Sequence, residues 1–173
     1  MDQLLQPHVL LLLGILAALG LRHWLRAALA RRRRPALILD GSNVMHWRDA
    51  TPSLETLSEV VWHLTAKGYR VGVVFDANAG YLLSGRYLHD GALAQHLRLP
   101  VSRVMVVPKG TPADPVILDT ARDMGARVVS NDRFRDWADA YPEVTAPGFL
   151  IRGGYGAKGP WLRLDETADQ TFP

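Results

Sequence analysis

The feature that most constrains the fold is a repeated pairing of a short apolar run with a longer stretch of helical periodicity. The apolar runs are too short for helices and lie at residues 36–39, 71–75, 104–107 and 127–129. Such runs are typical of parallel strands that are buried on both faces. Strands that alternate with helices favour a three-layer α/β/α fold, with a parallel, Rossmann-like sheet between two layers of helices.

The longer stretches carry the start and stop signals of helices. The first has Thr51 as its expected N-cap, Pro52 at the first helical position and Gly68 beyond its end. Three more helices are expected, at residues 92–99, 115–124 and 133–140. An edge strand is expected at residues 149–152, and the glycine-rich segment RGGYGAKG, which begins at the end of that strand, is expected to be a loop.

The first 34 residues differ from the rest of the chain. Residues 9–21 read VLLLLGILAALGL and carry no charge, and arginines follow them. Counted from Leu4 to Leu25, the apolar stretch reaches the roughly 17–25 residues that a membrane span needs. We expect residues 1–34 to form a single-pass transmembrane or signal-anchor helix whose arginine flank and following domain are cytoplasmic. The alternative is a peripheral helix that lies in the membrane interface.

The basic character of the chain comes from this N-terminal segment. Residues 1–34 carry six arginines and one acid, a net charge of +5. Residues 35–173 carry fourteen basic and sixteen acidic side chains, a net charge of −2. The positive charge therefore suits anionic lipid headgroups, and it does not indicate that the whole domain is a basic nucleic-acid-binding surface.

Carboxylates follow the predicted strands, where a ligand site is expected. Asp40 ends the first apolar run, Asp114 opens a helical pattern and Asp132 follows the fourth run. In an open α/β sheet, ligands bind at the carboxyl ends of the strands. Several aspartates there repel one another unless a cation neutralises them, and oxygen ligands suit Mg²⁺ or Mn²⁺. Asp136, one helical turn after Asp132, would face the same site, and Asp76 ends the second strand.

Each acid also has a purely structural interpretation. Asp114 and Asp132 could be helix N-caps, a role that stabilises by about 1 kcal/mol, and Asp76 could cap the loop that follows it. Asp40 is harder to explain in this way, because a carboxylate directly after an apolar strand is costly to desolvate unless it is paired or liganded. His46 is close enough in sequence to reach the site, although metal-bound water needs no histidine base.

Two further patterns limit the function. Gly154, Gly156 and Gly159 match GxGxxG, but no strand–helix unit surrounds them, so they do not indicate a dinucleotide site. The chain has no cysteine, which excludes disulfides, thiolate zinc sites and a cysteine nucleophile.

Four segments, in order along the chain, resemble a known nuclease family. They are LILDGSNVMH (37–46), VVFDAN (73–78), ADPVIL (113–118) and VVSNDRFRDW (128–137). Together they are similar to the NYN branch of the PIN-like ribonucleases, and most of all to the Regnase type, the CCCH-zinc-finger-associated ribonuclease domain. The resemblance implies a PIN-like nuclease domain over residues 35–155, with a C-terminal tail at 156–173. It also implies an Mg²⁺-dependent endoribonuclease that acts on single-stranded RNA or stem-loops.

The resemblance also implies roles for individual residues. The family's acids match Asp40, Asp114, Asp132 and Asp136, and the first three of these would hold the metal. Candidates for orienting the acids or contacting a phosphate are Ser42, Asn43, Asn131, Arg133, Arg135 and Arg152. The family has two adjacent acids where this chain has Ala113 followed by Asp114, so one carboxylate is lost, and Asp76 could compensate for it.

We therefore expect a membrane-anchored endoribonuclease that uses metal-activated water to hydrolyse a phosphodiester. One alternative is a catalytically weakened domain that binds RNA or scaffolds a membrane complex. Another is a metal-dependent nucleotide phosphohydrolase on a similar sheet. A homodimer is expected by analogy, because NYN and PIN domains often dimerise and a membrane anchor raises the local concentration.

Overall fold

The computed structural model describes residues 13, 15–17, 19–22, 34–49 and 51–164. The chain divides into two units, Met1–Arg34 and Pro35–Pro173. Most of the N-terminal stretch that was expected to span a membrane lies outside the described residues. Among the residues that are described, no helix is both long enough and apolar enough to cross a membrane.

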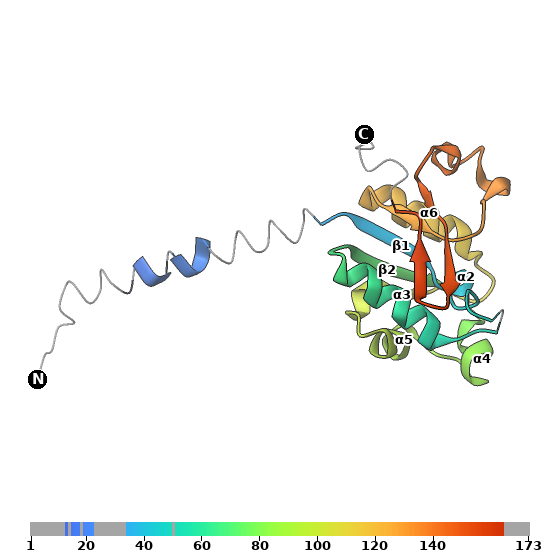
Figure 1. Cartoon of the computed structure of the whole chain (residues 1–173), viewed down its shortest axis with the longest axis horizontal. Coiled ribbons are helices and arrows are strands. Elements are labelled where there is room, and N and C mark those ends of the chain that lie inside the picture. Colours follow the sequence, from blue (N-terminus) through green and yellow to red (C-terminus); the bar gives the residue numbers. More distant parts are fainter. Residues whose placement is uncertain (1–12, 14, 18, 23–33, 50, 165–173) are drawn as a thin grey trace, which may run out of the picture. The chain divides into compact units, whose positions relative to one another are not determined.

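The second unit is built on a five-stranded parallel sheet (Figure 1). Its strands are β1 (Ala36–Asp40), β2 (Arg70–Phe75), β3 (Val104–Val106), β4 (Arg127–Val129) and β5 (Leu150–Ile151). They lie in the order β3-β2-β1-β4-β5, with β1 in the centre. The predicted parallel α/β sheet is confirmed, and the continuous apolar runs are its buried strands. Because β1 is central, its last residue, Asp40, lies in the middle of the carboxyl edge.

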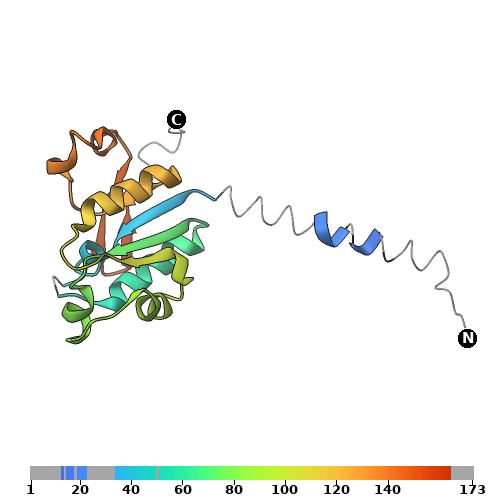
Figure 2. The same cartoon turned by 180° about the vertical axis from the view of Figure 1, so that it is seen from behind.

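Helices cover both faces of this sheet. The α-helices are α2 (Gly41–Val44), α3 (Leu54–Ala66), α4 (Ala79–Ser84), α5 (Asp90–Leu97) and α6 (Ala113–Met124), and the 3₁₀ turns are η1 (Val101–Arg103), η2 (Arg135–Trp137) and η3 (Pro142–Thr145). Helices α3 and α5 bury their apolar sides with one core, and α6 buries its apolar side with the other. Successive residues of β1 belong to alternate cores, as the pleat of a strand requires. Figures 1 and 2 show α3 and α6 on opposite sides of the sheet.

Three of the predicted helices begin at other residues than the sequence signals suggest: α6 begins at Ala113, two residues early, and side-chain caps set the starts of the other two. Helix α3 is capped by Ser53, whose Oγ accepts a hydrogen bond from Thr56 N at 3.2 Å, and not by Thr51. Helix α5 begins at Asp90, two residues early, because the His89 side chain caps it. In both cases a side chain with a free acceptor takes up the first amide groups of the helix.

Two predictions near the C-terminus are wrong. Residues 133–140 do not form an α-helix, because Phe134 adopts a left-handed conformation with φ of 48° and buries its ring, and only η2 follows. The glycine-rich segment is not a loop. It forms an antiparallel hairpin of β6 (Gly153–Gly156) and β7 (Gly159–Leu162). The last residue of β7, Leu162, packs against the core beneath α3, which ties the hairpin to the domain.

Candidate active site

Asp40 ends the central strand and is buried, with 8% of its surface exposed. Its Oδ1 accepts a hydrogen bond from Asn43 N at 3.0 Å, and its Oδ2 accepts one from Ser130 Oγ at 2.9 Å. Burial raises the pKa of Asp40 to about 6, and the charges of Asp76 and Asp114 add to the rise, while the two hydrogen bonds oppose it. A buried carboxylate of this kind is characteristic of a functional site, where another charge compensates it.

Asp114 lies in the first turn of α6 and is half-buried. Its Oδ2 accepts a hydrogen bond from Trp137 Nε1 at 3.1 Å. Burial raises the pKa of Asp114, the bond from Trp137 lowers it, and the negative charges of Asp132, Asp76 and Asp136 raise it further. The N-cap position of α6 precedes this residue, so Asp114 is not the helix cap that the structural interpretation required.

These electrostatic effects connect five acids at one edge of the sheet. Asp40 is influenced by Asp76 and Asp114, and Asp114 in turn by Asp132, Asp76 and Asp136. The ion pairs found among the described residues join other acids to Arg48 and Arg122, and none includes any of these five aspartates. The five acids are thus near enough to influence one another, and within the described part of the chain none of them has an ion-pair partner.

The donor set of this cluster fits a hard divalent cation. Carboxylate oxygens are the preferred ligands of Mg²⁺, and a cation would offset the burial and the weaker repulsion that raise the pKa values of Asp40 and Asp114. Within the described part of the chain, however, no three acidic or histidine side chains already stand close enough to hold an ion. Asp132 Oδ1 accepts a hydrogen bond from Phe134 N at 2.8 Å, so one oxygen of that carboxylate is engaged by the local backbone.

The expected placement of Asp132 and Asp136 on one helix is wrong, because no α-helix forms there. Asp132 precedes the left-handed Phe134, and Asp136 lies in the 3₁₀ turn η2. Both carboxylates nevertheless act on Asp114, so the chain brings them to the same edge by an irregular path.

Ser130 is a site residue that the sequence did not indicate. It is fully buried, and its Oγ both donates to Asp40 Oδ2 and accepts from Asp132 N at 3.0 Å. One hydroxyl group therefore connects the buried acid of β1 to the backbone that carries the next acid. The strand register explains its position: β4 pairs Val129 with Leu39, so the residue that follows β4 lies beside Asp40.

Ser42 and Asn43 lie on α2, directly after Asp40. Ser42 Oγ accepts a hydrogen bond from Asp76 N at 2.9 Å, so it positions the backbone of that acid. Asn43 donates its backbone N–H to Asp40, while its Oδ1 accepts from Trp47 Nε1 at 2.9 Å and from Asn131 N at 3.0 Å. Asn43 thus holds three segments together at this edge.

Asn131 was expected to orient the acids, but its side chain bonds the hairpin. Asn131 Nδ2 donates to Gly153 O at 2.9 Å, and Asn131 Oδ1 accepts from Gly153 N at 3.2 Å. Because Asn131 lies between Ser130 and Asp132 in the chain, this pair of bonds places the base of the hairpin beside the acids.

The remaining candidates lie around this edge. Arg133 and Arg135 are exposed on either side of the buried Phe134, and Arg152 is half-buried between β5 and β6. His46 Nδ1 donates to Ser42 O at 2.8 Å, which engages the imidazole in the local turn.

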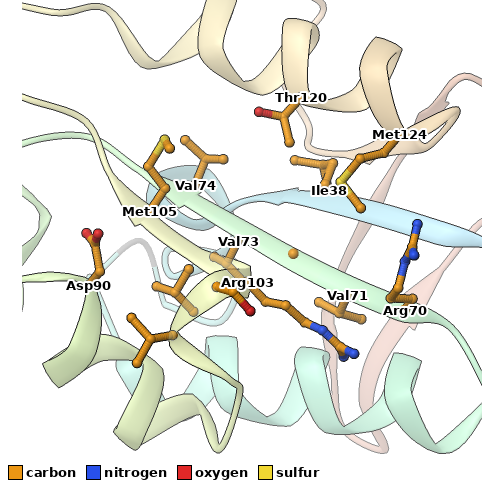
Figure 3. A pocket seen from close by; sticks show the side chains of 14 residues that line it. Ile38, Arg70, Val71, Val73, Val74, Asp90, Arg103, Met105, Thr120 and Met124 are labelled. Carbon is orange, nitrogen blue, oxygen red and sulfur yellow. The ribbon is translucent and has the colours of Figure 1, made fainter. Parts of the chain in front are cut away.

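A hollow of about 640 Å³ lies elsewhere, on the α6 face of the sheet beside the edge strand β3. Figure 3 shows Val74, Met105 and Met124 around it. The acid at its rim is Asp90, whose Oδ1 accepts from Val106 N at 2.8 Å. None of the five clustered aspartates lines this hollow, so it is separate from the candidate active site.

Residues 32–146 match the family model of the Zc3h12a-like ribonuclease NYN domain. The chain belongs to this family. The predicted resemblance to NYN ribonucleases is therefore confirmed. The match ends before β6, so the matched residues do not include the hairpin.

Two solved structures share the fold of this NYN domain. The crystal structure of nuclear proteinaceous RNase P 2 (PRORP2) from A. thaliana matches with a TM-score of 0.58 and 16% identity, over 75% of this chain and 30% of that one. The structure of Arabidopsis thaliana nuclear protein-only RNase P 2 (PRORP2) matches with a TM-score of 0.55 and 19% identity, over 88% and 35%. The chain thus spans about a third of those proteins. No curated protein matches it in sequence.

Proposed function

We propose that the domain is a metal-dependent endoribonuclease whose catalytic residues are Asp40, Asp114, Asp132 and Asp136. The observation that carries the proposal is Asp40, a buried carboxylate at the centre of the carboxyl edge with its pKa raised to about 6. Together with four further aspartates, it forms a site that a divalent cation would neutralise. Membership of a ribonuclease family supports RNA as the substrate.

Asp40, Asp114 and Asp132 are the residues that would hold Mg²⁺ or Mn²⁺. Such an ion polarises a phosphoryl oxygen and lowers the pKa of a bound water. Ser130 favours the ionised form of Asp40, because its hydroxyl donates to the carboxylate. Asp136 would orient the attacking water or accept its proton.

Four more residues complete the proposed site. Asp76 acts electrostatically on both Asp40 and Asp114, and it takes the place of the acid that the family carries at Ala113. Arg133, Arg135 and Arg152 flank the edge and supply positive charge for the phosphates of the strand.

The test is cleavage of circular single-stranded RNA, which only an endonuclease can open. The full-length protein, in detergent, is incubated with this RNA in Mg²⁺, in Mn²⁺ and in EDTA, beside the Asp40→Asn variant. We expect the wild-type protein to produce linear RNA in Mg²⁺ or Mn²⁺ but not in EDTA. We expect the Asp40→Asn variant to produce none in any of the three conditions. Absence of cleavage by folded wild-type protein in both metals contradicts the proposal.

A catalytically weakened, RNA-binding domain is the second candidate. Two observations favour it: the absence of a preformed three-ligand group among the described residues, and Ala113 in place of an acid. RNA binding without cleavage in the same experiment would select it. Release of phosphate from free nucleotides, with the circular RNA intact, would instead indicate a nucleotide phosphohydrolase.

We also propose that residues 1–34 attach the domain to the cytoplasmic side of a membrane, as a single-pass or peripheral anchor, and that the protein forms a homodimer there. The uncharged residues 9–21 and the arginines that follow support the anchor. Carbonate extraction of isolated membranes separates a spanning from a peripheral helix, and recovery of the protein in the soluble fraction before any carbonate treatment contradicts both. Sedimentation in detergent tests the dimer.

A further inference from the structure

The hairpin β6–β7 carries an exposed tryptophan on a face lined by glycine. Gly154 pairs with Trp161, and alternation along the strands puts both on the face opposite Leu162. A Cβ atom at Gly154 would lie 2.9 to 3.0 Å from three ring atoms of Trp161, so the indole rests directly on this glycine. Trp161 is nonetheless 47% exposed. The glycine therefore lets the indole lie against the hairpin while part of it stays open to solvent.

This hairpin is basic within an acidic domain. From residue 152 to 163 the chain carries Arg152, Lys158 and Arg163 and neither aspartate nor glutamate, whereas residues 35–173 have a net charge of −2. Lys158 and Arg163 are exposed. Positive charge beside an accessible aromatic ring is the combination by which proteins bind single-stranded nucleic acids: the charges contact phosphates and the ring stacks on a base.

The hairpin begins beside the acidic cluster. The Asn131 side chain makes two hydrogen bonds to the backbone of Gly153, and the residue before Asn131 is Ser130, which bonds Asp40. Gly153 pairs with Leu162, so Trp161 lies one residue pair along the hairpin from the point of attachment. An RNA strand that stacks on the indole would therefore be held on a hairpin whose base is bonded to the segment that carries Asp132.

The inner face of the hairpin is anchored to the domain. The Tyr155 hydroxyl hydrogen-bonds Glu59 and Arg48, and the Arg48 guanidinium lies 4.0 Å from the centroid of the Tyr155 ring. Leu162 packs into the core of the α3 face. The outer face is thus held in place before any ligand arrives, which reduces the entropy lost on binding.

We infer that the outer face of the hairpin is a binding platform for single-stranded RNA. Trp161 stacks on one base, and Lys158 and Arg163 contact the phosphates beside it. The inference rests on the proposed function and adds to it the part of the substrate that is held next to the acids. Because every base has an aromatic face, the platform holds the strand without selecting its sequence.

The test measures binding of the full-length protein, in detergent and EDTA, to a fluorescein-labelled single-stranded RNA by fluorescence anisotropy. Stacking of one base predicts that Trp161→Ala raises the Kd about tenfold, and that Trp161→Phe recovers most of the affinity. The matched control is Trp62→Ala, which removes a tryptophan that is 73% exposed on α3 and should leave the Kd unchanged. Circular dichroism verifies that all variants are folded.

A second variant tests the charges. Lys158→Gln with Arg163→Gln should flatten the plot of log Kd against log salt concentration by about 1.4 for two lost phosphate contacts on a single strand. An unchanged slope, an unchanged Kd for Trp161→Ala, or equal losses from Trp161→Ala and Trp62→Ala would overturn the inference. So would a folded wild-type protein that binds no RNA, which would reassign the face to a protein partner.

Because binding is measured in EDTA, its outcome is separate from that of the cleavage test. Wild-type protein that binds through Trp161 but cuts no RNA supports the platform and contradicts the endonuclease. Wild-type protein that cuts RNA while Trp161→Ala binds normally contradicts the platform alone.

Discussion

The acidic edge and the hairpin are adjacent regions joined by Asn131, but their polar groups are stabilised to different degrees before a ligand binds. At the edge, Asp40 is buried among like charges and its pKa is raised to about 6. In the hairpin, the contacts of Tyr155 and Leu162 hold the inner face against the domain, and the outer face presents the indole of Trp161. The first region is costly to fold until a cation arrives, and the second is fixed in advance.

The largest expected effect is at Asp40, where substitution should lower the activity and raise the stability of the protein. Asp40→Asn should lower the rate of RNA cleavage by at least about a thousandfold, as loss of a metal-holding acid removes several kcal/mol of transition-state stabilisation. In EDTA at pH 7 the same variant should be more stable, by up to about 3 kcal/mol, because the charge that burial opposes is gone. Single-turnover cleavage and urea unfolding measure the two quantities.

A matched variant for that comparison is Asp90→Asn, which alters an aspartate at the rim of the separate hollow. Cleavage by Asp90→Asn should stay near that of wild type. If Asp40→Asn loses stability at pH 7 and keeps its activity, Asp40 is a structural residue and the contrast between the two regions disappears.

Metal binding should stabilise the acidic edge and leave the hairpin unaffected. Mg²⁺ at a hundred times its Kd stabilises the folded protein by about 2.7 kcal/mol, which raises the Tm by several degrees. The rise should be absent in Asp40→Asn and present in Trp161→Ala, because only the first variant removes a proposed ligand. Differential scanning fluorimetry with increasing Mg²⁺ makes the measurement, and an equal rise in all three proteins would place the ion elsewhere.

The pH dependence sharpens the same contrast. Asp40 must be ionised to hold a cation, and burial raises its pKa from 3.8 to about 6, so cleavage should increase as the pH rises through about 6. In EDTA, stability should change in the opposite direction with pH. The contribution of Asp40 to the free energy of unfolding is greatest below pH 3.8 and is lost as the pH rises to about 6.

Ser130→Ala should move the cleavage profile to higher pH, because it removes a hydrogen bond that favours the ionised carboxylate. The control is Ser102→Ala, which changes a serine at the separate hollow and should leave the profile in place. A profile for Ser130→Ala that coincides with that of wild type would show that the serine does not tune Asp40.

The smallest expected effect compares two glycines on the outer face of the hairpin. A methyl group at Gly154 would lie within about 3 Å of the Trp161 ring, whereas one at Gly156 would lie 3.9 Å from its nearest ring atom. Gly154→Ala should therefore displace the indole and weaken RNA binding by about two- to threefold, with little change in Tm, and Gly156→Ala should not. Equal Kd values for Gly154→Ala and Gly156→Ala in fluorescence anisotropy would mean that the contact between Gly154 and the indole does not contribute to RNA binding.

The sequence predicted the sheet well because its strands are buried on both faces. The runs that form β1 and β2, and the last two residues of β4, are mostly apolar and buried, which is typical of strands covered on both faces. The hairpin gave no such signal, because glycines have no side chains to alternate and its pairing depends on distant contacts of Tyr155 and Leu162. The path after β4 was missed for a related reason: the left-handed backbone of Phe134 is stabilised by burial of its ring in the tertiary structure.

At the candidate site, residue type and position in the sequence indicated the acids but not the residues that hydrogen-bond around them. Asp40 and Asp114 stand out because they end or begin predicted elements. Ser130 is a common residue type whose importance depends on strand register, and Asn131 bonds a hairpin that was not predicted. Such roles follow from three-dimensional neighbours, which one sequence does not specify.

The strand order also explains why the site lies where it does. From β1 the chain builds outward through β2 and β3 on one side, and only later returns to add β4 and β5 on the other. The segments that leave β1 and β4 diverge toward opposite faces, which makes this edge the topological switch point of the sheet, where α/β proteins bind ligands. The switch point is a property of the chain path and needs no particular carboxylate. Variants that lose every acid would keep it, so the same edge would remain available to a different ligand.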